Sequence, residues 1–92
     1  MRHLICYDIE EDKVRARLVK LLEAYGVRIQ YSVFEFNLSK ARWTDLKLNL
    51  KEKGFLDGSI SIVIYPLSAE AYELVERYGA ASIWDEGDMV FD

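Results

Sequence analysis

The apolar positions of residues 4–9, Leu-Ile-Cys-Tyr-Asp-Ile, fall on both alternating faces of an extended chain and are interrupted by a single carboxylate, Asp8. A run of this kind is typical of a β-strand that is covered on both sides. Asp8 stands where the buried strand ends, just before the acidic turn Glu10-Glu11-Asp12. Because an ionised carboxylate is costly to bury without a cation or donors beside it, we expect Asp8 either to cap local backbone or to hold a metal.

The next stretch repeats apolar residues at three- and four-residue steps, which predicts a helix that ends with Gly26 as its C′ residue. Its apolar stripe consists of Val14, Leu18, Leu21, Leu22 and Tyr25, and its basic face of Lys13, Arg15, Arg17 and Lys20. Cations near a helix N-terminus oppose the macrodipole, a small penalty that a bound phosphate or a neighbouring carboxylate can offset. A simple solvated face is an equally good interpretation of the spacing.

From Val27 to Leu38 the period changes to two, which predicts extended chain. The apolar phase moves from odd positions to even positions at Phe34 and Phe36. Such a switch indicates a bulge, a sharp bend between two strands, or a segment buried on both faces. We place the bend between Gln30 and Val33.

Ser39 is predicted to cap a second helix with the buried stripe Trp43, Leu46 and Leu50, which Gly54 ends. The alternation of residues 59–65 predicts another strand, closed by Pro66.

The remaining chain predicts a short helical segment at residues 68–78, ended by Gly79, followed by apolar stretches at residues 80–84 and 89–91. The last stretch is suited to a terminal strand, which either pairs with another chain or closes its own sheet.

This order of elements is that of an α+β fold, the split βαβ or ferredoxin-like sandwich, with an additional C-terminal strand. A chain of 92 residues makes one domain, residues 1–92. Both helices of such a fold cover one sheet face. Since the first strand is apolar on both faces, we expect the other face to be covered by a sheet-to-sheet homodimer, which would bring two copies of Asp8 toward a shared axis.

Composition changes this picture in two respects. The net charge of −4 disfavours nucleic acid as a partner, but basic residues outnumber acidic ones in residues 1–53, and the reverse holds in residues 54–92. A basic surface can therefore exist on an acidic protein. Cys6 is the only cysteine, which excludes an intrachain disulfide and predicts a small buried strand residue. No membrane span or signal peptide is predicted, so we expect a cytoplasmic protein.

One group of residues in a single register closely resembles the small CRISPR-associated endonuclease of the spacer-acquisition module, the Cas-two family. The residues that carry the resemblance are Tyr7-Asp8-Ile9, Asp12, Arg15, Leu22, Tyr25-Gly26, Arg28, Gln30, Ser32-Val33-Phe34-Glu35 and Ile64-Tyr65-Pro66-Leu67. The match spans residues 1–67, whereas residues 68–92 match only in kind.

The resemblance implies a ferredoxin-like homodimer with a divalent metal at the dimer axis, held by Asp8, and hydrolysis of phosphodiester bonds in RNA or DNA. It also implies a partnership with the larger integrase of the CRISPR adaptation module. By position, it assigns Tyr7 and Asp8 to the active-site strand. It assigns Arg15 and Arg17 to a phosphate-facing helix, and Arg28, Ser32 and Phe34 to the adjoining strand.

In the mechanism we expect, Mg2+, or alternatively Mn2+, is held by two copies of Asp8 with waters completing the coordination. Arg15, Arg17 and Arg28 would bind phosphate oxygens, Ser32 would orient a water or phosphate, and Phe34 would form a wall of the site. No general base is nominated, since the sole histidine, His3, points by parity to the face opposite Asp8.

Two other functions compete with the nuclease. One is a non-catalytic dimeric scaffold that bridges integrase units and positions DNA. The other is an RNA-binding module of the RRM type, which fits poorly because its exposed aromatic sheet motif is absent. The aromatic residues Tyr31, Phe34, Phe36 and Trp43 are predicted to be core residues and not base-stacking platforms.

Overall fold

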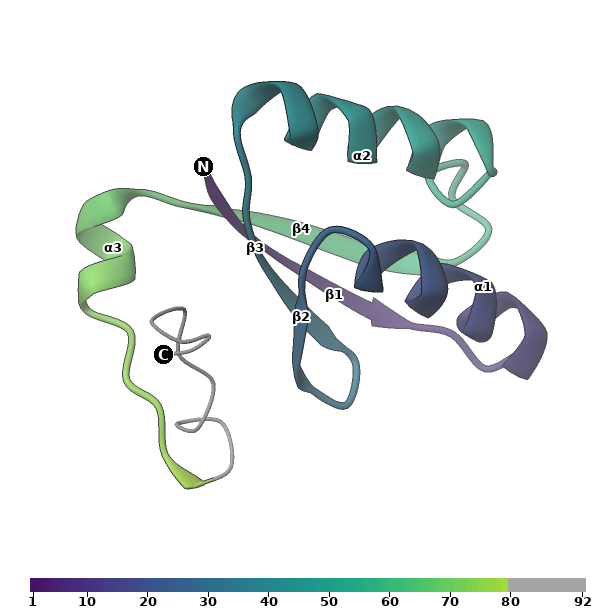
Figure 1. Ribbon diagram of the computed structural model, residues 1–92. Coiled ribbons are helices and arrows are strands. Elements are labelled where there is room, and N and C mark those ends of the chain that lie inside the picture. The colour runs from purple at the N-terminus through teal and green to yellow at the C-terminus, as the bar shows by residue number, and fades with distance from the viewer. Residues whose placement is uncertain (80–92) are drawn as a thin grey trace.

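The computed structural model describes residues 1–79, which form a four-stranded antiparallel sheet in the order β2-β3-β1-β4 with helices packed against it (Figure 1). The elements in chain order are β1 (Arg2–Asp8), α1 (Asp12–Glu23), β2 (Val27–Gln30), β3 (Val33–Asn37), α2 (Lys40–Glu52), β4 (Ser61–Leu67) and α3 (Ala69–Glu73). The predicted α+β architecture is confirmed for these residues.

The hydrophobic core lies between the sheet and the two longer helices, which Figure 1 shows on the same side of the sheet. Alternate residues of β1 and β3 point toward this core, and the predicted stripes of α1 and α2 meet them there. Among residues 1–79, the fully buried large apolar side chains are Ile5, Leu18, Leu22, Phe34, Phe36, Leu46 and Leu50. One face of the sheet is therefore closed by the helical layer.

Residues 1–79 cover the opposite face of β1 only in part. Leu4 and Cys6 are half-buried there, and Asp8 at the end of the strand is exposed. Within the described part of the chain, the expected cover of β1 on both sides is therefore present on one face only. No cost of burial arises for the Asp8 carboxylate, because Asp8 is the last residue of β1 and is exposed.

The predicted bend between Gln30 and Val33 is a β-hairpin. Tyr31 and Ser32 form a two-residue turn between β2 and β3, and the register of the pair shifts between Arg28 and Gln30. The structure therefore combines two of the alternatives, a bend between strands and a bulge. Because of this turn, the alternating apolar residues are odd-numbered before it and even-numbered after it.

The sequence predicted the residues at both ends of α2 correctly, but Gly26 after α1 has a different role from the one predicted. The Ser39 hydroxyl accepts a hydrogen bond from the backbone N–H of Arg42 at 3.2 Å, and Gly54 adopts a φ of 83° after α2. The prediction that Gly26 is the C′ residue of α1 is wrong: α1 ends at Glu23 with Ala24 as its C-cap, and Gly26 is not among the glycines with positive φ. Its lack of a side chain makes room for β3: an added Cβ would lie 2.5 Å from the carbonyl oxygen of Glu35 and even closer to the ring of Phe36.

We expect Gly26→Ala to lower the free energy of unfolding by about 1–3 kcal/mol, the usual cost of overpacking. The contacts at fault are a backbone oxygen and a buried ring, neither of which can move freely. Urea denaturation followed by circular dichroism measures the change. Gly58→Ala is a useful comparison, because it is strained by its φ of 93° but would meet no atom within 4 Å. A Gly26→Ala variant as stable as the parent would contradict the packing explanation.

The C-terminal half of the predicted pattern needs two corrections. Pro66 lies inside β4 and does not close it, which is tolerated because β4 is an edge strand of the described sheet. The helix predicted at residues 68–78 is shorter, Ala69–Glu73. The stretches predicted at residues 80–84 and 89–91, including the additional C-terminal strand, lie outside the described residues. Within residues 1–79 no helix has the length and apolarity needed to span a membrane.

Candidate functional site

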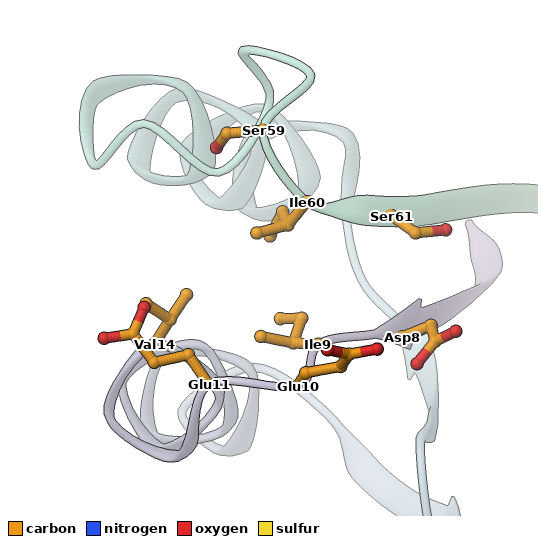
Figure 2. A pocket seen from close by; sticks show the side chains of 8 residues that line it. All are labelled: Asp8, Ile9, Glu10, Glu11, Val14, Ser59, Ile60 and Ser61. Carbon is orange, nitrogen blue, oxygen red and sulfur yellow. The ribbon is translucent and has the colours of Figure 1, made fainter.

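Asp8 occupies the last position of β1, where it pairs with Ser61 of β4. Its carboxylate is exposed and accepts no hydrogen bond from any of residues 1–79. Figure 2 shows the Asp8 and Ser61 side chains next to each other at the strand ends, pointing away from Val14 of α1. The carboxylate is therefore open to a ligand from the solvent side of the sheet.

Two cavities border Asp8. One, of about 320 Å³, lies between the start of α1 and the start of β4, and its lining includes Glu10, Glu11, Ser59 and Ser61 (Figure 2). The other, of about 380 Å³, lies toward the β2–β3 turn. Its lining residues are Tyr7, Asp8, Ile9, Arg15, Tyr31 and Ser32.

Tyr7 links the end of β1 to the β2–β3 turn through hydrogen bonds. Its ring is buried in the core, and its hydroxyl donates to the carbonyl of Tyr31 at 3.3 Å and accepts from an Nη of Arg28 at 3.3 Å. Its backbone N–H donates to the carbonyl of Ser32 at 3.1 Å. Since both hydrogen-bonding functions of the phenol are used within the chain, Tyr7 supports the site and presents no free group to it.

The resemblance assigns Arg28, Ser32 and Phe34 to one strand adjoining β1, but only Phe34 lies on such a strand, β3. Arg28 lies on β2, which pairs with β3 and not with β1, and Ser32 lies in the turn between them. Arg28 is exposed on β2, and its guanidinium lies 5.6 Å from the centre of the Phe34 ring. Phe34 is fully buried, and it lines neither cavity that borders Asp8. The structure thus places Phe34 in the core beneath the site and not in its wall.

The two arginines of α1 are separated. Arg15 turns back onto the loop before the helix: one Nη donates to the carbonyls of Ile9 at 2.7 Å and Glu10 at 3.4 Å, and the other pairs with Asp12. Arg17 borders a third cavity of about 480 Å³ with Lys20, Leu21, Lys53 and Phe55. Asp8, Tyr7, Arg15 and Ser32 are therefore brought together, with Arg28 joined to them through Tyr7, whereas Arg17 and Phe34 stand apart.

Tyr31 is the residue near the site that the sequence analysis misjudged. It was expected in the core, but it lies in the β2–β3 turn with 77% of its surface exposed. It borders the same cavity as Asp8. Its position inside the predicted bend could have indicated its exposure, because a turn residue does not belong to either face of the sheet.

A second residue outside the predicted set, Glu35, is buried on the sheet face opposite the helices. Its carboxylate accepts a hydrogen bond from Arg77 at 2.6 Å and lies 3.9 Å from an Nη of Arg2. The Arg2 guanidinium in turn stacks 3.6 Å from the Tyr72 ring centre. These contacts hold the segment after α3 against one end of the open sheet face, away from Asp8.

His3 lies on the face of β1 that its parity predicts, whereas Cys6, predicted to be buried, is only half-buried. His3 is buried on the helix side of β1, opposite in parity to Asp8, with its ring stacked 3.6 Å from that of Trp43. Burial lowers the pKa of His3. Burial also raises the pKa of the Cys6 thiol, which favours the unreactive protonated form.

Residues 1–79 of a single chain offer few side chains that could bind a metal ion. Among residues 1–79, no group of three or more His, Cys, Asp and Glu side chains is arranged to hold a metal ion. Mg2+ keeps most of its waters and is often held by only one or two carboxylates. An exposed Asp8 whose carboxylate accepts no hydrogen bond within residues 1–79 fits this requirement.

Comparison with known proteins places the chain in a family. The family model described as CRISPR associated protein Cas2 matches residues 1–75. A CRISPR-associated endoribonuclease Cas2 of Synechocystis sp. is 40% identical over 77 residues, covering 84% of this chain and 83% of the relative. A Cas2 endoribonuclease of Thermus thermophilus is also 40% identical, covering 83% and 80%. The chain therefore belongs to the Cas2 family.

Solved structures agree with this assignment. Streptococcus pyogenes Cas2 is 33% identical with a TM-score of 0.68, covering 86% of this chain and all of that one. A chain of a partial Cas6-RT-Cas1–Cas2 complex is 33% identical with a TM-score of 0.67, covering 84% of each chain. The family resemblance found in the sequence is confirmed.

Proposed function

We propose that this protein is a metal-dependent endonuclease of CRISPR adaptation that hydrolyses phosphodiester bonds in RNA or DNA at Asp8. The observation that carries the proposal is the open Asp8 carboxylate at the end of β1, between two cavities and without a hydrogen-bond partner among residues 1–79. A carboxylate that serves only to cap local backbone would have a donor beside it. The names of the relatives as endoribonucleases support the same activity.

We also propose a ferredoxin-like fold that dimerises sheet to sheet. The strand order β4-β1-β3-β2 with both longer helices on one face supports the fold. The uncovered face supports the dimer: Val63 and Tyr65 are 44% and 50% exposed, and Leu4, Cys6 and Val33 beside them are half-buried. Asp8 projects from this same face, so a two-fold contact there would bring two carboxylates together. A monomer in analytical ultracentrifugation at micromolar concentration would contradict the shared site.

In this mechanism, Asp8 from each protomer would hold a Mg2+ or Mn2+ ion, which would supply Lewis acidity toward the phosphate and activate a water. Arg28, exposed beside Tyr7, neutralises charge on the phosphate, and Ser32 at the turn orients a water or a phosphate oxygen. Arg15 keeps the loop after Asp8 in place through its bonds to the carbonyls of Ile9 and Glu10.

The direct test uses labelled single-stranded RNA and duplex DNA with the purified protein. We expect cleavage with Mg2+ or Mn2+ and none once a chelator is added, because the proposed mechanism takes the activated water from the ion. Restoring the metal should restore the activity. Cleavage that persists in chelator would contradict the proposal.

A second candidate function is architectural: a dimer that bridges units of the adaptation integrase and positions the DNA to be inserted. The similarity to a chain of a Cas6-RT-Cas1–Cas2 complex favours this role. The two functions are compatible in one protein. They separate if cleavage and spacer acquisition respond differently to a change at Asp8.

A further inference from the structure

The tip of the β2–β3 hairpin presents an aromatic ring to solvent beside the proposed metal ligand. Tyr31 is one of the most exposed large hydrophobic residues in the described part of the chain, at 77%. The guanidinium of Arg28 lies 5.9 Å from the centre of the Tyr31 ring. A single exposed apolar side chain is ordinary. What distinguishes Tyr31 is that it lines the cavity of about 380 Å³ that Asp8 also lines.

The backbone that carries this ring is fixed to the strand that carries Asp8. Tyr7, the residue before Asp8, donates from its hydroxyl to the Tyr31 carbonyl and from its backbone N–H to the Ser32 carbonyl. The turn has only two residues, so it has little freedom to move away. The two hydrogen bonds therefore set the position of the Tyr31 backbone relative to Asp8.

We infer that Tyr31 stacks on an unpaired base of a single-stranded nucleic acid whose phosphate lies at Asp8. Every base has a π-face, so an exposed ring can hold any of the four bases without reading sequence. Bases inside a duplex are already stacked on their neighbours and do not offer that face. The nearby Arg28 adds a cation beside both the ring and the backbone. This inference rests on the proposed function, because it takes Asp8 as the position of the phosphate.

The inference predicts single-strand binding that depends on the ring. Dissociation constants would be measured in chelator, without cleavage, for a short labelled single-stranded RNA, the matching single-stranded DNA and the matching duplex. We expect Tyr31→Ala to weaken binding of the single strands by about 5- to 150-fold, the range for loss of one base–aromatic stack. Tyr31→Phe, which keeps the ring, should bind as the parent does. Duplex binding should not change.

Tyr78→Ala is the matched control, since Tyr78 is 75% exposed but lies on the segment after α3. It should leave single-strand binding unchanged. A series of oligonucleotides, each with one abasic position, then locates the stacked base. In the parent protein one position should weaken binding when its base is missing, and in Tyr31→Ala that position should no longer matter.

Several results would overturn the inference: equal single-strand affinity of Tyr31→Ala and the parent, an equal loss for duplex, or an abasic series in which no position responds. These outcomes are separate from the test of the nuclease. Metal-dependent cleavage with no effect of Tyr31 would reject only the stacking. Ring-dependent single-strand binding without any cleavage would reject only the nuclease.

Discussion

Asp8→Ala should reduce metal-dependent cleavage by about 1,000-fold or more. The ion stabilises the transition state by several kcal/mol, and each ~1.4 kcal/mol is a factor of ten in rate. If two Asp8 carboxylates hold the ion, one substitution removes both. Initial rates on the better of the RNA and DNA substrates, over a range of Mg2+ and Mn2+ concentrations, measure the effect.

The same substitution should leave the fold intact. Asp8 is exposed at the end of β1, and its carboxylate makes no hydrogen bond within residues 1–79, so we expect a change in unfolding free energy within about 0.5 kcal/mol. Asp8→Asn is an informative companion, because it keeps the shape of the side chain and removes only its charge. Glu10→Gln is the control, since Glu10 is an exposed carboxylate of the adjoining cavity.

The outcomes separate the two proposed functions. Loss of cleavage in Asp8→Ala and Asp8→Asn, with Glu10→Gln active, supports a catalytic Asp8. If spacer acquisition in cells continues with the Asp8→Ala protein, the cellular task is architectural even though the nuclease exists. Full metal-dependent cleavage by Asp8→Ala would contradict the assignment of the site to this residue.

Sequence reasoning succeeded where structure depends on neighbours in the chain. The stripe of Trp43, Leu46 and Leu50 is buried as its spacing predicted, and the Ser39 cap closes the start of that helix. The phase switch after Gln30 located the hairpin between β2 and β3. Each of these depends on a periodicity or on a capping hydrogen bond that spans only a few residues.

Sequence reasoning failed where the environment of a residue depends on contacts between distant segments. The buried Glu35 accepts a hydrogen bond from Arg77, 42 residues away, and nothing in the local pattern of β3 indicates that partner. The basic face of α1 could not show that Arg15 turns back onto the loop carbonyls while Arg17 borders another cavity. An aromatic side chain can lie in a turn as well as in the core, so the residue type alone did not show that Tyr31 is outside the core.

Phe34 is the residue for which the family resemblance and the packing lead to different expectations. As a wall of the active site, it would act on the substrate. In the structure its ring is fully buried, 6.4 Å from the centre of the Tyr7 ring and 6.2 Å from that of Phe36. We therefore expect its main contribution to be to stability.

Phe34→Ala should lower the free energy of unfolding by about 3–5 kcal/mol, the range for removing a fully buried Phe. For a domain whose total stability is on the order of 5–15 kcal/mol, this is a large fraction. Thermal and urea unfolding followed by circular dichroism measure it, and we expect the melting temperature to fall by more than about 10 °C. Leu48→Ala on the exposed side of α2 is the control, with an expected change within about 0.5 kcal/mol.

Phe34→Leu distinguishes a core role from a catalytic one. Leucine keeps most of the buried apolar volume, so this variant should remain folded at assay temperature with a loss of about 1.5 kcal/mol or less. If Phe34 acts only through packing, the folded Phe34→Leu protein cleaves at a rate close to that of the parent. A variant that is fully folded by circular dichroism but has lost cleavage would show that the ring reaches the substrate, and it would restore Phe34 to the site.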